Sequence, residues 1–169
     1  MMVGFCCLKI YNKKSQVEID GNITDFESCS EAGNAVMESY PRQCRTGDGR
    51  LFVEDIGNEL EKIDLVRVDF PRPQQKISSP LRISGQARGF WFFEASFPVS
   101  LFDAQGRVLA QGLATAQTDW MTEDFVSFEA ELEFENQTSG SRGTLVLEKD
   151  NPSGLPENED SLEVPVVFY

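Results

Sequence analysis

The sequence contains no histidine, and this absence excludes several kinds of enzyme site. Histidine is the general base of serine and cysteine triads and a frequent ligand of zinc. An enzyme built from this chain would have to work with carboxylates, cysteine, tyrosine or lysine. The composition therefore favours a protein that is not an enzyme.

Positive charge is also scarce. The chain has 15 lysines and arginines against 28 aspartates and glutamates, which gives a net charge of −13. Because phosphate backbones repel so acidic a protein, we expect no nucleic-acid partner. The apolar fraction of 40%, with 13 phenylalanines, is sufficient for a folded core in one large or two small domains.

A long hydrophobic run is missing too. The first apolar segment, MMVGFCCLKIY, is too short to span a bilayer. It lacks the charged first region and the small-residue cleavage site of a complete signal peptide. We interpret residues 1–16 as the remnant of a membrane anchor or export signal, with a packed or frayed first strand as the alternative.

Residues 17–56 form a first module, for which the pattern predicts a helix followed by a hairpin. Thr24 and Glu27 fit a capping box, and the helix should run to about Ala32 and stop at Gly33. Turn residues at 46–50 then precede a returning strand. We therefore expect a small α+β unit.

The two cysteines of this module, Cys29 and Cys44, predict a disulfide. In an oxidising compartment the bond would join helix to hairpin. Closing a loop of about 15 residues stabilises a fold by roughly 3 kcal/mol in the chain-entropy model. The alternatives are two buried thiols or a metal site, although two cysteines without histidine make a poor zinc site.

Residues 57–65 are polar and charged, and we expect a linker there. The remainder, residues 66–169, has the alternation and turn spacing of seven short strands. We expect them near residues 65–70, 81–87, 91–101, 108–116, 126–134, 143–149 and 162–168. This pattern predicts a seven-stranded immunoglobulin-like antiparallel β-sandwich.

A hairpin spanning residues 90–116 is expected at the centre of the sandwich. The odd positions from Trp91 to Leu101 are all apolar, which is typical of a strand with one buried face. Turn residues 103–106 follow, so Phe102 should pair with Arg107 and Leu101 with Val108. Large side chains would then face small ones along the ladder.

The clearest alternation lies at residues 126–135. The expected inward residues are Val126, Phe128, Ala130, Leu132 and Phe134, and the outward ones are Ser127, Glu129, Glu131, Glu133 and Glu135. Paired carboxylates can hydrolyse a glycoside when they flank a cleft. On an exposed strand they form a solvated surface, which is the reading we adopt.

Residues 117–124 break the strand pattern, and we expect a loop there that binds a partner. Its candidate contact residues are Asp119, Trp120, Met121, Glu123 and Asp124. A large aromatic residue in a polar loop often dominates an interface. The turn at 151–158 would assist. Trp120 could instead close the core, and the carboxylates could bind Ca²⁺, although their spacing matches no EF-hand.

Several motifs carry a family resemblance. They are Ser79-Pro80-Leu81, Ile83–Phe90, Trp91–Glu94, Phe102–Gly106, Asp119–Thr122, Phe125-Val126, Gly143–Leu147, Asn151–Gly154 and Val164–Val166. In this order they resemble the bacterial spore-germination-associated immunoglobulin-like domain over about residues 66–169. The resemblance implies an exported or surface-attached interaction module with no catalytic residues.

The first module has weaker resemblances. Residues 23–55 resemble a small two-Cys module of exported bacterial proteins, one without a known activity. The spacing from Cys44 through Asp48-Gly49 to Phe52 is similar to the signature of Kazal-type protease inhibitors. It is one residue longer than that signature, and the other four cysteines of those inhibitors are missing.

These observations predict a non-catalytic extracytoplasmic protein, membrane-tethered or secreted, that acts as a binding module at the bacterial cell envelope. The expected partner is an envelope protein or polysaccharide, and no cofactor is expected. The alternatives are a secreted protease inhibitor acting through the two-Cys module and a hydrolase that uses carboxylates.

Overall fold

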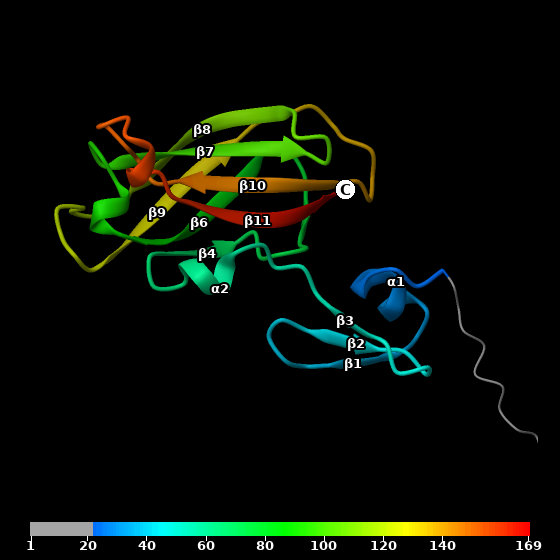
Figure 1. The fold of residues 1–169 in the computed structure, drawn as a ribbon. Helices are drawn as coiled ribbons and strands as arrows, with labels where there is room; N and C mark the ends of the chain where they lie inside the picture. The colour runs from blue at the N-terminus through cyan, green and yellow to red at the C-terminus, as the bar shows by residue number, and fades with distance from the viewer. Residues whose placement is uncertain (1–21) are drawn as a thin grey trace, which may run out of the picture. The chain divides into compact units, whose positions relative to one another are not determined.

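The computed structural model describes residues 22–169, so the interpretation of residues 1–16 as an anchor or export-signal remnant lies outside the described part. The chain forms two compact units, which divide between Glu54 and Asp55. The first contains both cysteines of the predicted disulfide, and the second contains the large β-sheet (Figure 1).

The smaller unit has one short helix and a three-stranded sheet. Its elements are α1 (Phe26–Glu31), β1 (Ala35–Met37), β2 (Gln43–Arg45) and β3 (Leu51–Val53). The strands are antiparallel in the order β1-β2-β3. Their central residues Val36, Cys44 and Phe52 are paired across the sheet and pack with the helix residues Phe26 and Cys29.

Helix α1 begins one residue later than the sequence pattern predicted. Asp25 is the N-cap in place of Thr24, and its carboxylate accepts a hydrogen bond from the Ser28 N–H at 2.8 Å. The Ser28 hydroxyl accepts from the Asp25 N–H at 3.1 Å, which is the role predicted for Glu27. Aspartate is the stronger cap of the two candidates, which explains the shift.

The predicted disulfide is present. Cys29 of α1 and Cys44 of β2 are joined, with their Cα atoms 6.1 Å apart, and both are fully buried. Ile23 and Phe26 complete the buried cluster. So small a core gives little stability alone, and the disulfide compensates by restricting the unfolded chain.

The larger unit is a β-sheet of eight strands with one short helix and two 3-10 segments. In chain order these are α2 (Glu59–Lys62), β4 (Val66–Phe70), β5 (Lys76–Ile77), β6 (Leu81–Arg88), η1 (Gly89–Trp91), β7 (Ser96–Asp103), β8 (Val108–Ala116), β9 (Phe125–Leu132), β10 (Arg142–Glu148), η2 (Pro156–Asn158) and β11 (Ser161–Phe168). The immunoglobulin-like fold is confirmed, with one strand more than predicted.

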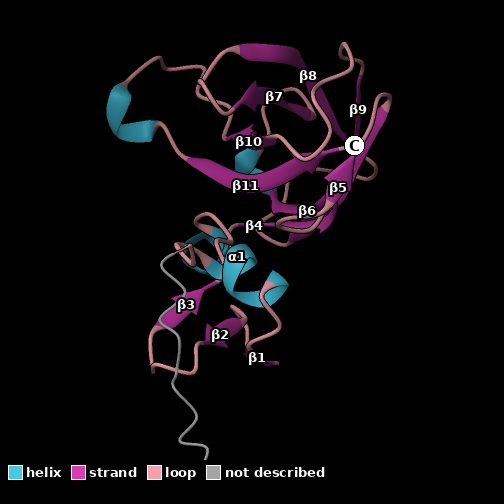
Figure 2. Cartoon of the chain, turned by 90° about the vertical axis from the view of Figure 1, so that its right-hand side faces the viewer, coloured by secondary structure: helices cyan, strands magenta, loops and turns pink. Residues whose placement is uncertain are grey.

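The sheet has the order β4-β6-β9-β8-β7-β10-β11-β5 and curls over on itself (Figure 2). Strands β8 and β9 are paired at only two positions, Thr115 with Glu129 and Ala116 with Phe128. Across the curl, the rings of Phe97 in β7 and Phe128 in β9 lie 5.0 Å apart. The inner faces of β4, β6 and β9 therefore share one core with those of β7, β10 and β11.

Strand β9 has the predicted inward and outward faces. Val126, Phe128 and Leu132 are buried, and Ala130 and Phe134 are partly buried. The four glutamates Glu129, Glu131, Glu133 and Glu135 are exposed. The strand ends at Leu132, so Glu133 and Glu135 lie on the following connection.

The prediction of a strand beginning at Trp91 was wrong. Residues Gly89–Trp91 form η1, and β7 begins only at Ser96. Trp91 and Phe92 are both buried, while Phe93 is 42% exposed, so the apolar alternation of this segment does not come from a strand. The buried Trp91 and Phe92 side chains close the end of the core instead.

The register of the β7–β8 hairpin was also wrong, by two residues. Asp103 hydrogen-bonds Arg107, which makes the loop shorter than predicted, and the register shifts between Leu101 and Phe102. Leu101 therefore pairs with Ala110 instead of Val108. Because a shift of two residues preserves the face of every side chain, the predicted pairing of large with small residues survives.

Residues 57–65, predicted as a linker, contain α2 and attach to β11. The Asn58 side chain donates to the Ser161 carbonyl at 3.0 Å and accepts from the Glu163 N–H at 2.8 Å. Gly57 has φ +64, and a Cβ there would lie 2.0 Å from the Glu163 carbonyl oxygen. Only glycine therefore fits this close approach.

The short strand β5 was not predicted, and it continues this attachment. It pairs parallel with the end of β11, Lys76 with Val167 and Ile77 with Phe168. Just before it, the Gln74 N–H donates to the Pro165 carbonyl at 2.7 Å. The segment between β4 and β6 thus crosses from one layer of the sandwich to the other.

Candidate binding surface at the loop end of the sandwich

Three connections lie at one end of the sandwich, which we call the loop end (Figure 1). They are residues 89–95 between β6 and β7, 117–124 between β8 and β9, and 149–160 between β10 and β11. The connections at the opposite end are residues 71–80, 104–107 and 133–141. In variable immunoglobulin domains, loops gathered at one end in this way form the antigen-binding site.

The first two connections pack together through Gly89. Its N–H donates to the Asp124 carbonyl at 3.1 Å. A Cβ at this position would lie 1.9 Å from the Thr122 carbonyl oxygen and 2.3 Å from that of Trp120. The loop at 117–124 is therefore held against η1 by a contact that leaves no room for any side chain.

Trp91 joins the third connection to the other two. Its side chain is fully buried, and its carbonyl accepts a hydrogen bond from the Asp150 N–H at 3.0 Å. The indole Nε1–H of Trp91 has no acceptor among the described residues, which is an unfavourable state for a buried donor. Burial of the ring fixes the base of the loop end.

A tight turn projects from this base. Phe93 and Ser96 exchange backbone hydrogen bonds, and Glu94 and Ala95 between them have φ values of 49° and 62°. Two consecutive left-handed residues define a type I′ turn, which is normally made with asparagine or glycine. The turn is therefore strained at two non-glycine positions, as often occurs at functional sites.

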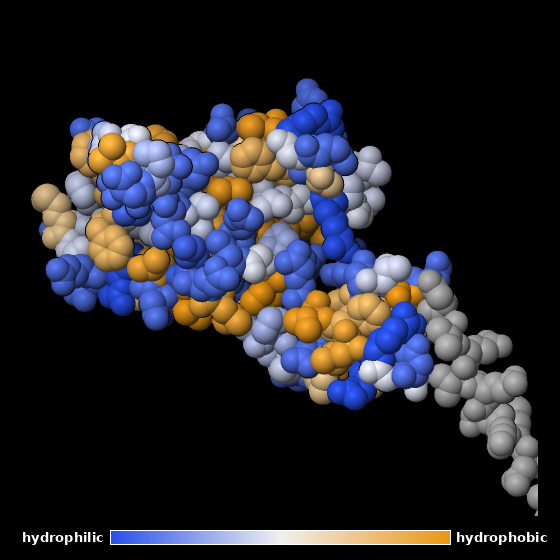
Figure 3. All heavy atoms as spheres, viewed as in Figure 1, coloured by the Kyte–Doolittle hydropathy of each residue, from blue (hydrophilic) through white to orange (hydrophobic). Residues whose placement is uncertain are grey.

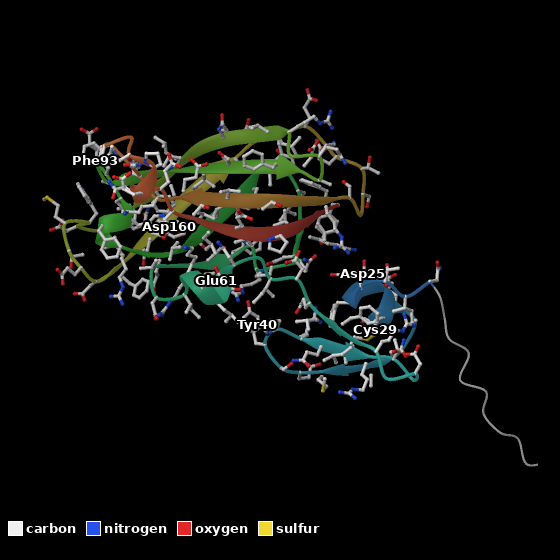
Figure 4. All side chains as sticks on the ribbon, viewed as in Figure 1. Asp25, Cys29, Tyr40, Glu61, Phe93 and Asp160 are labelled. Atoms are coloured by element: carbon white, nitrogen blue, oxygen red, sulfur yellow. A yellow bond between two sulfur atoms is a disulfide. The ribbon has the colours of Figure 1, made fainter. Side chains whose placement is uncertain are left out.

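Large apolar side chains are exposed on all three connections. They are Phe90 (50% exposed), Phe93 (42%), Met121 (75%) and Leu155 (49%). Figure 4 labels Phe93 at this end of the sandwich, and Figure 3 shows hydrophobic residues among hydrophilic ones there. Exposed apolar residues gathered on one part of a surface indicate an interaction site.

The two ends of the sandwich differ in the net charge of their connections. The three connections of the loop end carry eight carboxylates and one lysine, a net charge of −7. Those of the opposite end carry Arg72, Lys76 and Arg107 against Glu133 and Glu135, a net charge of +1. A potential of this sign at the loop end attracts cationic groups and repels anionic ones.

A hollow lies beside the loop end, between α2 and the ends of β10 and β11. Its ionisable lining is Glu61, Lys62, Glu148, Lys149, Glu159 and Asp160. Lys62 is paired with Asp160 at 2.5 Å. Figure 4 shows Glu61 and Asp160, which come from segments about a hundred residues apart in the chain.

The predicted contact residues all lie on the middle connection. Met121 is 75% exposed, and the three carboxylate residues are exposed as well, whereas Trp120 is partly buried and packs against the core. The Asp119 carboxylate accepts from the Met121 N–H at 3.0 Å, and the Glu123 carbonyl accepts from Arg88. Within residues 22–169, no three cysteine or carboxylate residues are grouped so that they could hold a metal ion.

Phe90 and Phe93 were not predicted as surface residues, because the apolar pattern of residues 90–116 was interpreted as a hairpin. Leu155, which follows the turn at 151–154, was not singled out either. A usable signal was present in Phe90–Phe93, because four consecutive large apolar residues cannot all occupy one face of a strand. Such a run at the end of a strand favours a connection that is partly buried and partly exposed.

The two alternative functions have less support in the geometry. The glutamates of β9 and the connection after it are exposed, and Glu131 lies within 3.4 Å of Arg82. Glu129 and Glu131 line a hollow on the sheet together with Arg82 and Leu113, but they are neighbours on one strand and do not face each other across it. The segment that resembles the Kazal signature is the hairpin of β2 and β3, whose centre Cys44 is buried. No helix within residues 22–169 is long and apolar enough to cross a membrane.

Comparison with known proteins gives a family but no annotated relative. The family model described as the immunoglobulin-like domain of bacterial spore germination matches residues 65–154. This range covers β4 to β10 and thus two of the three connections of the loop end completely. No curated protein matches the chain. Since the match includes 90 of 169 residues, the chain belongs to the family of the immunoglobulin-like domain of bacterial spore germination.

Proposed function

We propose that this protein is a non-catalytic, extracytoplasmic binding module, membrane-tethered or secreted, that contacts another component of the bacterial cell envelope through its loop end. One observation carries the proposal: three connections converge at one end of a rigid sandwich, and each exposes a large apolar side chain. Rigid sheets with variable loops suit recognition better than catalysis.

The extracytoplasmic location rests on a second observation. The Cys29–Cys44 disulfide is fully buried in the smaller unit and supports its core. Disulfides of this structural kind persist in oxidising compartments and are rare in the reducing cytosol. Family membership agrees with a bacterial interaction module but does not identify the biological process.

Binding can be tested with purified full-length protein immobilised and exposed to solubilised envelope from the bacterium that produces it. The loop-end double variant F93S/M121S should retain its envelope component at least tenfold less than wild type, because both anchors are removed. The control is V108S/Y169S, which removes two comparably exposed apolar residues outside the loop end. Equal retention by all three proteins would contradict the proposal.

Location can be tested with a thiol reagent in intact cells. In a C6S/C7S background, Cys29 and Cys44 are the only cysteines. They should react only after reduction and denaturation if the disulfide forms in the cell. Labelling without a reductant would contradict an oxidising location.

A further inference from the structure

The exposed apolar side chains of the loop end need an occupant, and the surrounding charge restricts its chemistry. Phe90, Phe93, Met121 and Leu155 are each between 42% and 75% exposed. Around them, the carboxylates of Glu94, Glu123, Glu157 and Glu159 are exposed and have no cationic partner among the described residues. Apolar anchors within an unneutralised acidic rim are complementary to a basic, partly apolar surface.

We infer that the loop end binds a cationic polypeptide segment, in which lysine or arginine residues flank an apolar side chain. This inference rests on the proposed function and names the partner of the same surface. An anionic lipid membrane or a phosphate-rich polymer is disfavoured, because the net charge of −7 on the three connections repels both. A small cation is disfavoured because it would leave the apolar side chains uncovered.

The hollow beside the loop end can accommodate the lysine or arginine side chain of the bound polypeptide. Among residues 22–169, only Asp160 of its four carboxylates has a cationic partner, Lys62 at 2.5 Å. Glu61, Glu148 and Glu159 remain for an incoming lysine or arginine, against which Lys149 is the single remaining cation of the lining. An apolar residue next to that lysine or arginine in the bound polypeptide would then cover Leu155. Leu155 lies on the connection that also supplies Glu159.

The test uses short fluorescent peptides and the full-length protein, with binding followed by fluorescence anisotropy. The first peptide combines lysine, leucine and glycine. In a second peptide glutamate replaces lysine, and in a third serine replaces leucine. We expect the first peptide to bind, the second not to bind, and the third to bind more weakly, with affinity falling as salt is raised.

Matched variants separate a local effect from the overall charge. E61Q/E157Q/E159Q removes Glu61 of the hollow and two carboxylates of the loop end, and E129Q/E133Q/E135Q removes three exposed carboxylates elsewhere on the sandwich. Both variants have the same net charge. The first should weaken binding of the lysine–leucine peptide about tenfold, and the second should leave it nearly unchanged.

The outcomes distinguish this inference from the proposed function. Equal weakening by both triple variants would mean non-specific charge attraction and would overturn the inference. Absence of peptide binding, or envelope retention that survives E61Q/E157Q/E159Q but not F93S/M121S, would overturn the cationic partner and leave the loop end as a binding surface. If F93S/M121S leaves envelope retention unchanged, the proposed function itself fails.

Discussion

The two ends of the sandwich are built on the same strands, but the side chains of their connections are bonded and exposed differently. At the opposite end, the polar groups of the turn at 103–107 bond one another: Asp103 accepts from the Gln105 and Arg107 N–H groups and pairs with the Arg107 side chain at 2.7 Å. At the loop end, the backbone is tied down, while four large apolar side chains are exposed and the carboxylates of Glu94, Glu123 and Glu157 have no cationic partner among the described residues.

This difference indicates that connections of one sheet can have separate roles. A turn whose polar groups are all satisfied within itself contributes to stability and has little left to offer a partner. A connection fixed through its backbone and a few buried side chains keeps its other side chains available, with little backbone entropy left to lose on binding. The loop end is of the second kind, and variants at the two ends of the sandwich can test this difference.

Replacing Gly89 by alanine should have the largest effect. The new Cβ would overlap the Thr122 and Trp120 carbonyl oxygens, so the loop at 117–124 would have to move away. We expect a loss of roughly 3 kcal/mol in the free energy of unfolding, measured by chemical denaturation. The control at the opposite end is G140A: Gly140 has φ +80 but open space around it, and should lose only about 1 kcal/mol. A smaller loss in G89A than in G140A would mean that the two loops are not locked together.

Relieving the strain in the turn at Glu94 and Ala95 should raise the free energy of unfolding, and by less than the Gly89 replacement lowers it. Replacing Glu94 by asparagine and Ala95 by glycine supplies the residues that a type I′ turn prefers. The double variant E94N/A95G should gain about 1 kcal/mol in the free energy of unfolding, since both positions have positive φ. A thermal melt compared with wild type measures this gain. If the double variant is less stable, the two residues do not adopt this conformation in solution.

The smallest predicted effect is at the opposite end and depends on pH. The hydrogen bond from the Arg107 N–H is the main cause that lowers the pKa of Asp103. A lowered pKa in the folded state means that the carboxylate stabilises the fold above about pH 3.9, its ordinary value. That contribution is lost as the pH falls through the lowered pKa.

The variant D103N should therefore have a lower Tm than wild type at neutral pH, with a difference that narrows on acidification below about pH 3.9. The control E157Q removes a loop-end carboxylate without a partner among the described residues and should leave the Tm unchanged at neutral pH. A constant difference between D103N and wild type at all pH values would exclude the charge of Asp103 as the cause.

Features determined by local spacing could be predicted from the sequence. The alternation at 126–135 gave the inward and outward faces of β9, and two cysteines in one small module gave the disulfide. Features determined by tertiary contacts could not. The start of β7 depends on burial of Trp91 at the end of the core, and the hairpin register depends on an irregularity after Leu101.

The candidate site was predicted only in part, for the same reason. Composition singled out the loop at 117–124, which is polar between two apolar strands. The convergence of three connections requires the strand order, which no local pattern contains. Likewise, the attachment of Asn58 to β11 joins residues 103 and 105 positions apart, so the segment around it resembled a free linker.

The outward backbone groups of β11 are bonded within the chain, and this affects whether a second molecule can add to the sheet. A terminal strand of a sheet is a template on which a second chain can add its own strand, and repetition of that step builds fibres. Here the outward groups of β11 are already bonded to Asn58, Gln74 and β5, and Pro165 has no N–H to offer. This side of the sheet therefore ends in the two-residue strand β5 and offers too short an edge for growth, so concentrated protein would not polymerise along it.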